Sequence, residues 1–211
     1  MKNGPLFFLG LFFVLALSWA GLLLGTHAQL GDLAPHFDEL EGKAFPQPAS
    51  GIAARGLLVY QDLGCAACHT QQVRRPGFGA DKERGWGDRQ SVARDYVYQS
   101  RPQLGVMRIG PDLANFGTRA ETNGSTPASL LADLYNGKGG MPAYRFLFEK
   151  HKIIGESSPK ALRGGAAAGF ELLPTPRAEA LVAYLFSLKQ TYEFSEAHPY
   201  EPVAAHEEGQ K

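Results

Sequence analysis

Cys-Ala-Ala-Cys-His, at residues 65–69, is the most informative stretch of this 211-residue sequence. Two thiols separated by two residues and followed directly by histidine suit covalent attachment of a c-type haem. The thiols of Cys65 and Cys68 would add to the two vinyl groups of the porphyrin, and the His69 imidazole would reach the iron as its proximal ligand. The chain contains no other cysteine. We therefore predict one covalently attached haem c.

Three other interpretations of the two cysteines stay open. A thioredoxin-like redox pair would follow a strand and precede a helix, whereas here the pattern indicates a helix before the motif and loop after it. A zinc site would need four ligands, and the remaining histidines are scattered along the chain. A disulfide across so short a loop would add little stability and would leave His69 unexplained.

The N-terminal region is apolar, because residues 5–24 contain no charged side chain. About 20 helical residues at ~1.5 Å each span the ~30 Å hydrocarbon layer, so we predict a transmembrane anchor over residues 5–25. A cleaved signal peptide is the alternative, although its apolar region is usually only about 7–15 residues long. Lys2 precedes the run, and residues 32–41 after it are acidic. The positive-inside rule therefore predicts a cytoplasmic N-terminus and, in a bacterium, a periplasmic remainder.

The rest of the chain is expected to be all-α, with long loops. The apolar spacing predicts a helix from near Gly51 to Leu63. Thr-Pro pairs predict two further helices, one over residues 126–136 and one that begins at residues 175–176. Residues 70–125 are expected to be mostly loop, with a short helix around 92–98. We assign a tether to 26–49, a haem domain to 50–192 with an insertion at 145–174, and a flexible tail to 193–211.

The second axial ligand of the iron is expected to be methionine, because His/Met ligation suits a high-potential electron carrier. Apart from Met1, the chain offers Met107 and Met141. Glycines at 137–140 would let the loop that carries Met141 curl over the haem face, and Pro142 would stiffen its exit. We therefore favour Met141, with Met107 as the alternative.

Four further residues are candidates for haem binding. A ligating imidazole usually donates its second N–H to a carbonyl, and the carbonyl of Pro111, in a Gly-Pro turn, is the candidate acceptor. The guanidinium groups of Arg74, Arg75 and Arg108 could neutralise the haem propionates.

Several motifs together resemble a known family, the mono-haem subunit II of cbb-type cytochrome c oxidases. They are Cys-Ala-Ala-Cys-His-Thr-Gln-Gln-Val-Arg-Arg-Pro at 65–76, Ser-Val-Ala at 91–93, Asp-Tyr-Val-Tyr at 95–98, Arg-Ile-Gly-Pro-Asp-Leu at 108–113, Met-Pro-Ala-Tyr at 141–144 and Ala-Leu-Val-Ala-Tyr-Leu at 180–185. The resemblance spans about residues 5–190. It implies a helical cytochrome c domain in which Cys65 and Cys68 are thioether sites and His69 and Met141 are axial ligands.

The resemblance also implies a function and its partners. The chain would relay electrons from a cytochrome c donor or a di-haem sister subunit to a membrane-embedded haem–copper catalytic subunit, and would have no catalytic site of its own. It would be a single-pass protein in contact with the lipid of the bacterial inner membrane. A subunit of another respiratory complex, such as a nitric-oxide reductase, and a periplasmic haem sensor are the alternatives. Nucleic acid is not an expected partner, because 21 basic residues balance 21 acidic ones.

Overall fold

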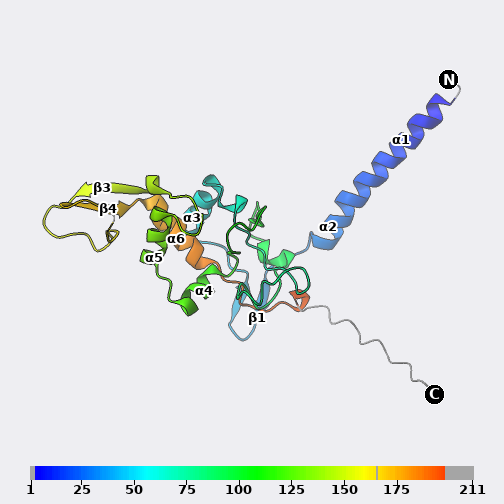
Figure 1. The fold of residues 1–211 in the computed structure, drawn as a ribbon. Coiled ribbons are helices and arrows are strands. Elements are labelled where there is room, and N and C mark those ends of the chain that lie inside the picture. Colours follow the sequence, from blue (N-terminus) through cyan, green and yellow to red (C-terminus); the bar gives the residue numbers. More distant parts are fainter. Residues whose placement is uncertain (1–2, 165, 198–211) are drawn as a thin grey trace, which may run out of the picture.

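An apolar helix forms the N-terminal end of the molecule in this computed structural model, which describes residues 3–164 and 166–197. It comprises α1 (Gly4–Trp19), the π-helical turn η1 (Ala20–Leu24) and α2 (Gly25–Leu30), which join into one 27-residue helix. At 1.5 Å per residue the helix is about 40 Å long, enough to cross a membrane. It projects from the rest of the chain (Figure 1), and no residue of it is buried. The helix thus continues five residues beyond the predicted anchor and includes the start of the predicted tether.

The core of the domain is built where α3 (Gly51–Asp62) crosses α6 (Pro176–Ser187). A Cβ atom at Gly56 would lie 1.9 Å from the Ala180 carbonyl oxygen, so only glycine lets the two helices approach so closely. The rings of Tyr60 and Tyr184 meet at the crossing with centroids 5.4 Å apart. Both helices were predicted, and both are confirmed to within a residue or two at their ends.

Two shorter helices cover this crossing. The predicted helix α5 (Pro127–Asn136) is confirmed, and Thr126 caps it by accepting a 3.1 Å hydrogen bond from Ser129 N. Helix α4 (Phe116–Asn123) lies within the segment predicted to be mostly loop. Its sequence is short and polar, so it has no apolar periodicity from which to predict it. Single turns of 3₁₀ helix complete the helical part: η2 (Cys65–Ala67), η3 (Ala93–Tyr96), η4 (Arg145–Leu147) and η5 (Ser195–Ala197).

Two antiparallel hairpins make the described chain mostly helical rather than all-α. The first pairs β1 (His36–Asp38) with β2 (Lys43–Phe45) inside the predicted tether. The second pairs β3 (Phe148–Lys152) with β4 (Phe170–Pro174) inside the predicted insertion. The expectation of no strands was therefore wrong. These strands are three to five residues long and carry many charges, so the period-2 pattern that identifies longer strands is weak.

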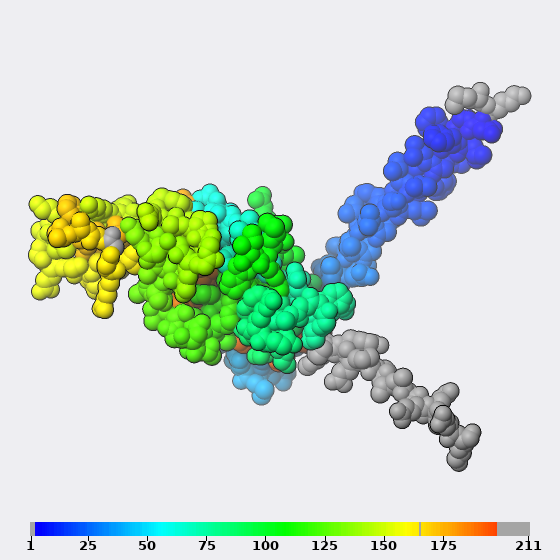
Figure 2. Space-filling view, viewed as in Figure 1, coloured from blue at the N-terminus to red at the C-terminus, as the bar shows by residue number. Residues whose placement is uncertain are grey.

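The hairpin β3–β4 forms an arm, residues 148–174, that stands out from the domain at the end opposite the anchor (Figure 2; yellow). Its root is attached to the core, where Leu147 is 1% exposed and its carbonyl accepts a 2.9 Å hydrogen bond from Thr175 N. Its far end is exposed, with Ile154 at 90%.

The segment after α6 returns to the base of the anchor. Phe194 and Ala197 are buried, and Phe194 contacts the ring of His36 in β1. Arg94 adds a salt bridge to Glu196 at 2.5 Å and a hydrogen bond to the carbonyl of Ala34. The prediction that the chain becomes a flexible tail at residue 193 was therefore wrong for residues 193–197, and the rest of that tail lies outside the described residues.

Candidate functional site: the Cys-Ala-Ala-Cys-His motif and its surroundings

The motif follows directly on α3. Gly64 ends the helix in the left-handed conformation, with φ +67°, and residues 65–67 then form the turn η2. The thiols of Cys65 and Cys68 are free and half-buried. Burial raises the pKa of Cys65 to about 11, whereas the thiols of disulfide oxidoreductases have lowered pKa values. Neither this pKa nor the preceding helix favours a thioredoxin-like redox pair.

The His69 ring is held by a contact that the sequence suggested. Its Nδ1 lies 2.8 Å from the Pro111 carbonyl oxygen. A carbonyl can only accept a hydrogen bond, so Nδ1 carries the proton and a neutral ring has its lone pair on Nε2. The ring also packs so closely on Gly110 that a Cβ atom there would lie 2.2 Å from Cε1. A hydrogen bond from the second ring nitrogen to a carbonyl is typical of metal-binding histidines.

Met141 sits in a tight loop that directly follows α5. Gly137, at φ +73°, leaves no room for a Cβ atom against the Met141 carbonyl, and Tyr144 N donates to Leu134 O at 2.8 Å, which returns the loop to α5. The Met141 side chain is half-buried and packs on the apolar core, as Cys65 does. Met107 is 52% exposed. The half-buried position of Met141 favours it over the exposed Met107 as the candidate methionine ligand of the iron.

Large apolar side chains beside the motif are exposed on the protein surface. Val106 is 81% exposed and Ile109 is 69% exposed, although Val106 N is bonded to the Ala66 carbonyl and Gly110 N to the Cys68 carbonyl. Tyr144 also lies near the motif: burial raises the pKa of its hydroxyl, and the nearby thiols of the motif raise it further. Exposed apolar groups around two free thiols and an oriented imidazole fit a flat, mostly apolar cofactor such as haem.

The three arginines occupy different environments. Arg74 and Arg75 are exposed, and the Arg75 guanidinium stacks on the Phe78 ring at 4.0 Å. Arg108 is instead in a buried network, in which all three guanidinium nitrogens already have protein partners. The contacts of Arg108 therefore do not favour the propionate role suggested for it.

The buried carboxylates of this network, Asp81 and Asp112, were missed from the sequence. Asp112 directly follows the Gly-Pro turn that contacts His69, and this position was a usable signal. Asp81 lies in an irregular segment rich in glycine and charge, where no pattern distinguishes it from a solvated residue.

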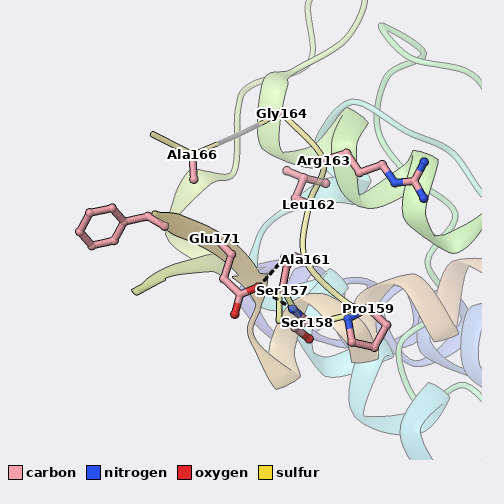
Figure 3. A pocket seen from close by; sticks show the side chains of 10 residues that line it. Ser157, Ser158, Pro159, Ala161, Leu162, Arg163, Gly164, Ala166 and Glu171 are labelled. Atoms are coloured by element: carbon pink, nitrogen blue, oxygen red, sulfur yellow. Dashed lines mark hydrogen bonds between the residues drawn. The ribbon is translucent and has the colours of Figure 1, made fainter. Parts of the chain in front are cut away.

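Other sites receive less support. Among residues 3–164 and 166–197, no group of three or more His, Cys, Asp or Glu side chains could hold a metal ion, so a zinc site has no ligand set there. A pocket of about 300 Å³ lies inside the arm, where Glu171 accepts hydrogen bonds from Ser157 and Ser158 (Figure 3). A groove of about 750 Å³ runs between α5, α6 and residues 159–163. Neither cavity includes the motif.

The fold and the site together define a class: a small, mostly helical domain that fits a haem and carries an apolar helix suited to membrane anchoring. A family model described as "Cytochrome C oxidase, mono-heme subunit/FixO" matches residues 22–163, which is more than half of the chain. The chain belongs to this family of mono-haem subunits of cytochrome c oxidase. No curated protein matches the chain. The family implies a haem cofactor and a place in an oxidase complex, and it confirms the resemblance inferred from the motifs.

Proposed function

We propose that the chain is a membrane-anchored c-type cytochrome that passes single electrons to the haem–copper catalytic subunit of a cbb-type oxidase. The electrons would come from a cytochrome c donor or a di-haem cytochrome c subunit. The observation that carries the proposal is the 2.8 Å contact between His69 Nδ1 and the Pro111 carbonyl oxygen, because it prepares the imidazole for a metal. A bound haem would supply the one-electron couple.

Cys65 and Cys68 would attach the cofactor covalently. Each thiol would add across one vinyl C=C bond of the porphyrin, with its sulfur bonded to one vinyl carbon and its hydrogen placed on the neighbouring one. The reaction has no leaving group and transfers no electrons to another reactant. The Cys65 thiol, with its pKa of about 11, would arrive at this step protonated at neutral pH.

His69 Nε2 and the Met141 sulfur would be the two side-chain groups that hold the haem iron. Both are held by backbone contacts of their own, His69 through Pro111 and Met141 through its loop. A site that keeps both ligands in place when an electron enters or leaves needs little reorganisation, and a thioether ligand favours the reduced state. Arg74 and Arg75 remain candidates for the propionates, because their guanidinium groups are accessible.

The anchor would hold the domain beside its partner. We propose the orientation predicted from Lys2 and the acidic residues after the helix, with the N-terminus in the cytoplasm and the haem domain in the bacterial periplasm. The folded unit would be residues 50–197, including the arm, rather than 50–192. Tethering in the membrane raises the local concentration of the two partners, so a small interface between them can suffice.

Haem attachment is the direct test. We expect the full chain, produced with a c-type maturation system, to stain for haem after denaturing electrophoresis and to exceed its amino-acid mass by one haem. A Cys65→Ser/Cys68→Ser protein should not stain. A wild-type mass that equals the amino acids alone would overturn the proposal.

The iron ligands can be tested with a matched pair of variants. Met141→Ala should lose the methionine-to-iron absorption band of the ferric protein, whereas Met107→Ala should keep it. The reverse result would assign the ligand to Met107. Purification of the native complex in detergent, followed by identification of its largest subunit, would test the oxidase partner against a nitric-oxide reductase.

A further inference from the structure

A buried polar network lies beside the turn that contacts His69. We propose that Arg108 is a positioning residue for His69: through Thr70 and Asp112 it holds the Pro111 carbonyl where it fixes the imidazole. This inference rests on the proposed function, in which His69 binds the iron.

Arg108 is the centre of the network, and each of its guanidinium nitrogens has a different partner. Nε donates to Thr70 Oγ1 at 2.9 Å, Nη1 to Asp81 Oδ1 at 2.5 Å and Nη2 to the Gln72 carbonyl at 2.5 Å. Asp112 Oδ2 lies 3.6 Å from Nη2. The planar fork of arginine meets these acceptors together, which the single ammonium of lysine cannot do.

Asp112 connects the network to the Gly-Pro turn at residues 110–111. Its Oδ2 accepts a 2.5 Å hydrogen bond from the Thr70 hydroxyl and a 2.8 Å hydrogen bond from Gln72 N. Thr70 directly follows His69, and Asp112 directly follows Pro111. The two residues that form the imidazole–carbonyl contact are therefore each one position away from a residue of the network.

The backbone holds the other side of the turn. Gly110 N donates to the Cys68 carbonyl at 2.9 Å, and Leu113 N donates to the Thr70 carbonyl at 2.7 Å. Pro111 lies between these two contacts. A shift of Asp112 would therefore move the Pro111 carbonyl, because Asp112 is the next residue in the chain and the backbone is held on both sides of the turn.

The network is shielded from water, so its geometry is tightly specified. The side chains of Asp112, Asp81 and Arg108 are 0%, 1% and 11% exposed. A second arginine, Arg119, donates to the Asp112 backbone carbonyl at 2.5 Å, so Asp112 is held through its backbone as well as through its side chain. A buried charge that loses its partner is costly, which disfavours rearrangement of the network.

The chain offers a matched control in Arg89 and Asp95. This pair is also buried, at 8% and 0% side-chain exposure, and its atoms approach to 2.7 Å. The hydrogen bonds of the Arg89 guanidinium go to Gln90, Asp95 and Tyr192, and none of these residues contacts the Gly-Pro turn in the hydrogen bonds described. Arg108→Lys and Arg89→Lys therefore each replace a buried, multiply hydrogen-bonded guanidinium group with an ammonium group of the same charge.

The experiment compares wild type, Arg108→Lys and Arg89→Lys as full-length haem-loaded proteins in detergent. In Arg108→Lys we expect hydrogen exchange at His69 Nδ1, followed by NMR of the reduced protein, to be about tenfold faster, the order expected when a hydrogen bond is lost. We also expect an upward shift of the midpoint potential, because a weaker Nδ1–H contact makes the imidazole a less basic ligand. Arg89→Lys should lower the melting temperature but leave exchange and potential as in wild type.

Each other outcome has a distinct meaning. Wild-type protein without haem would overturn the proposed function. Haem-loaded Arg108→Lys with wild-type exchange and potential would overturn the positioning role, as would equal changes in both variants. If Arg108→Lys yields no folded protein, Thr70→Val tests the positioning role instead. The same faster exchange at His69 Nδ1 and the same upward shift of the midpoint potential would support it, and wild-type values would overturn it. Thr70→Val removes the hydroxyl that bridges Arg108 and Asp112 without changing any charge.

Discussion

The turn beside His69 lies between α3 and α4, and the β3–β4 arm lies between α5 and α6, yet the two segments are stabilised in different ways. Around the turn, Asp81 and Asp112 are almost inaccessible, and their oxygens are satisfied by side-chain and backbone donors. The arm carries its charges in water, and its side chains are mostly exposed beyond the root. We therefore expect substitutions to cost more at the turn, where buried charges have partners, than in the arm, where the polar contacts are exposed to water.

Removal of a buried carboxylate should give the largest effect. We expect Asp112→Ala to lower the free energy of unfolding by about 3–5 kcal/mol, because it leaves buried donors without their acceptor and Arg108 with one carboxylate instead of two. Chemical denaturation of the haem-loaded protein measures this. If Asp112→Ala lowered the free energy of unfolding no more than the removal of an exposed carboxylate does, the turn would be no more constrained than the arm.

A steric clash introduced at the turn should give the second-largest loss of stability. In Gly110→Ala the new Cβ atom would lie 2.2 Å from the His69 ring, so the ring or the turn must move, at a cost of about 1–3 kcal/mol. We also expect an altered ligand-field spectrum of the ferric protein. Gly155→Ala in the arm is the control: its φ of +85° is unfavourable for alanine, but it should leave the spectrum unchanged.

Glu171 provides the counterpart of Asp112 in the arm. It accepts hydrogen bonds from Ser157 Oγ and Ser158 N, but water can replace it there. We expect Glu171→Ala to cost about 0.5–1 kcal/mol, measured by the same denaturation. A cost equal to that of Asp112→Ala would contradict the contrast between the two regions.

The sequence predicted features whose cause is local. The apolar spacing in α3, the Thr-Pro caps of α5 and α6, and the Gly-Pro turn at residues 110–111 each have a signal within a few residues. The Cys-Ala-Ala-Cys-His motif indicated the candidate site, and the contact between His69 and the Pro111 carbonyl is present as expected.

Features that depend on distant partners were not predictable in this way. The side chain of Arg108 was assigned to a propionate because its partner Asp81 lies 27 positions away, with no pattern connecting the two. Helix α4 has eight residues, most of them polar, and its Gly117 packs against the backbone of Phe186. Phe194 was placed in a mobile tail because its neighbours in sequence are polar, whereas its contacts are with β1.

The smallest effect is expected at Ile154 in the exposed part of the arm, and Leu147 at the root provides the contrast. Leu147 at the root and Ile154 beyond it are 1% and 90% exposed, so truncation of the first creates a cavity and truncation of the second does not. Leu147→Ala should cost about 2–5 kcal/mol, whereas Ile154→Ala should change stability by less than about 0.5 kcal/mol. Melting temperatures of the two haem-loaded variants measure the difference. Equal losses would mean that the exposed part of the arm belongs to the cooperative core as much as its root does. The arm would then be as sensitive to substitution as the turn beside His69.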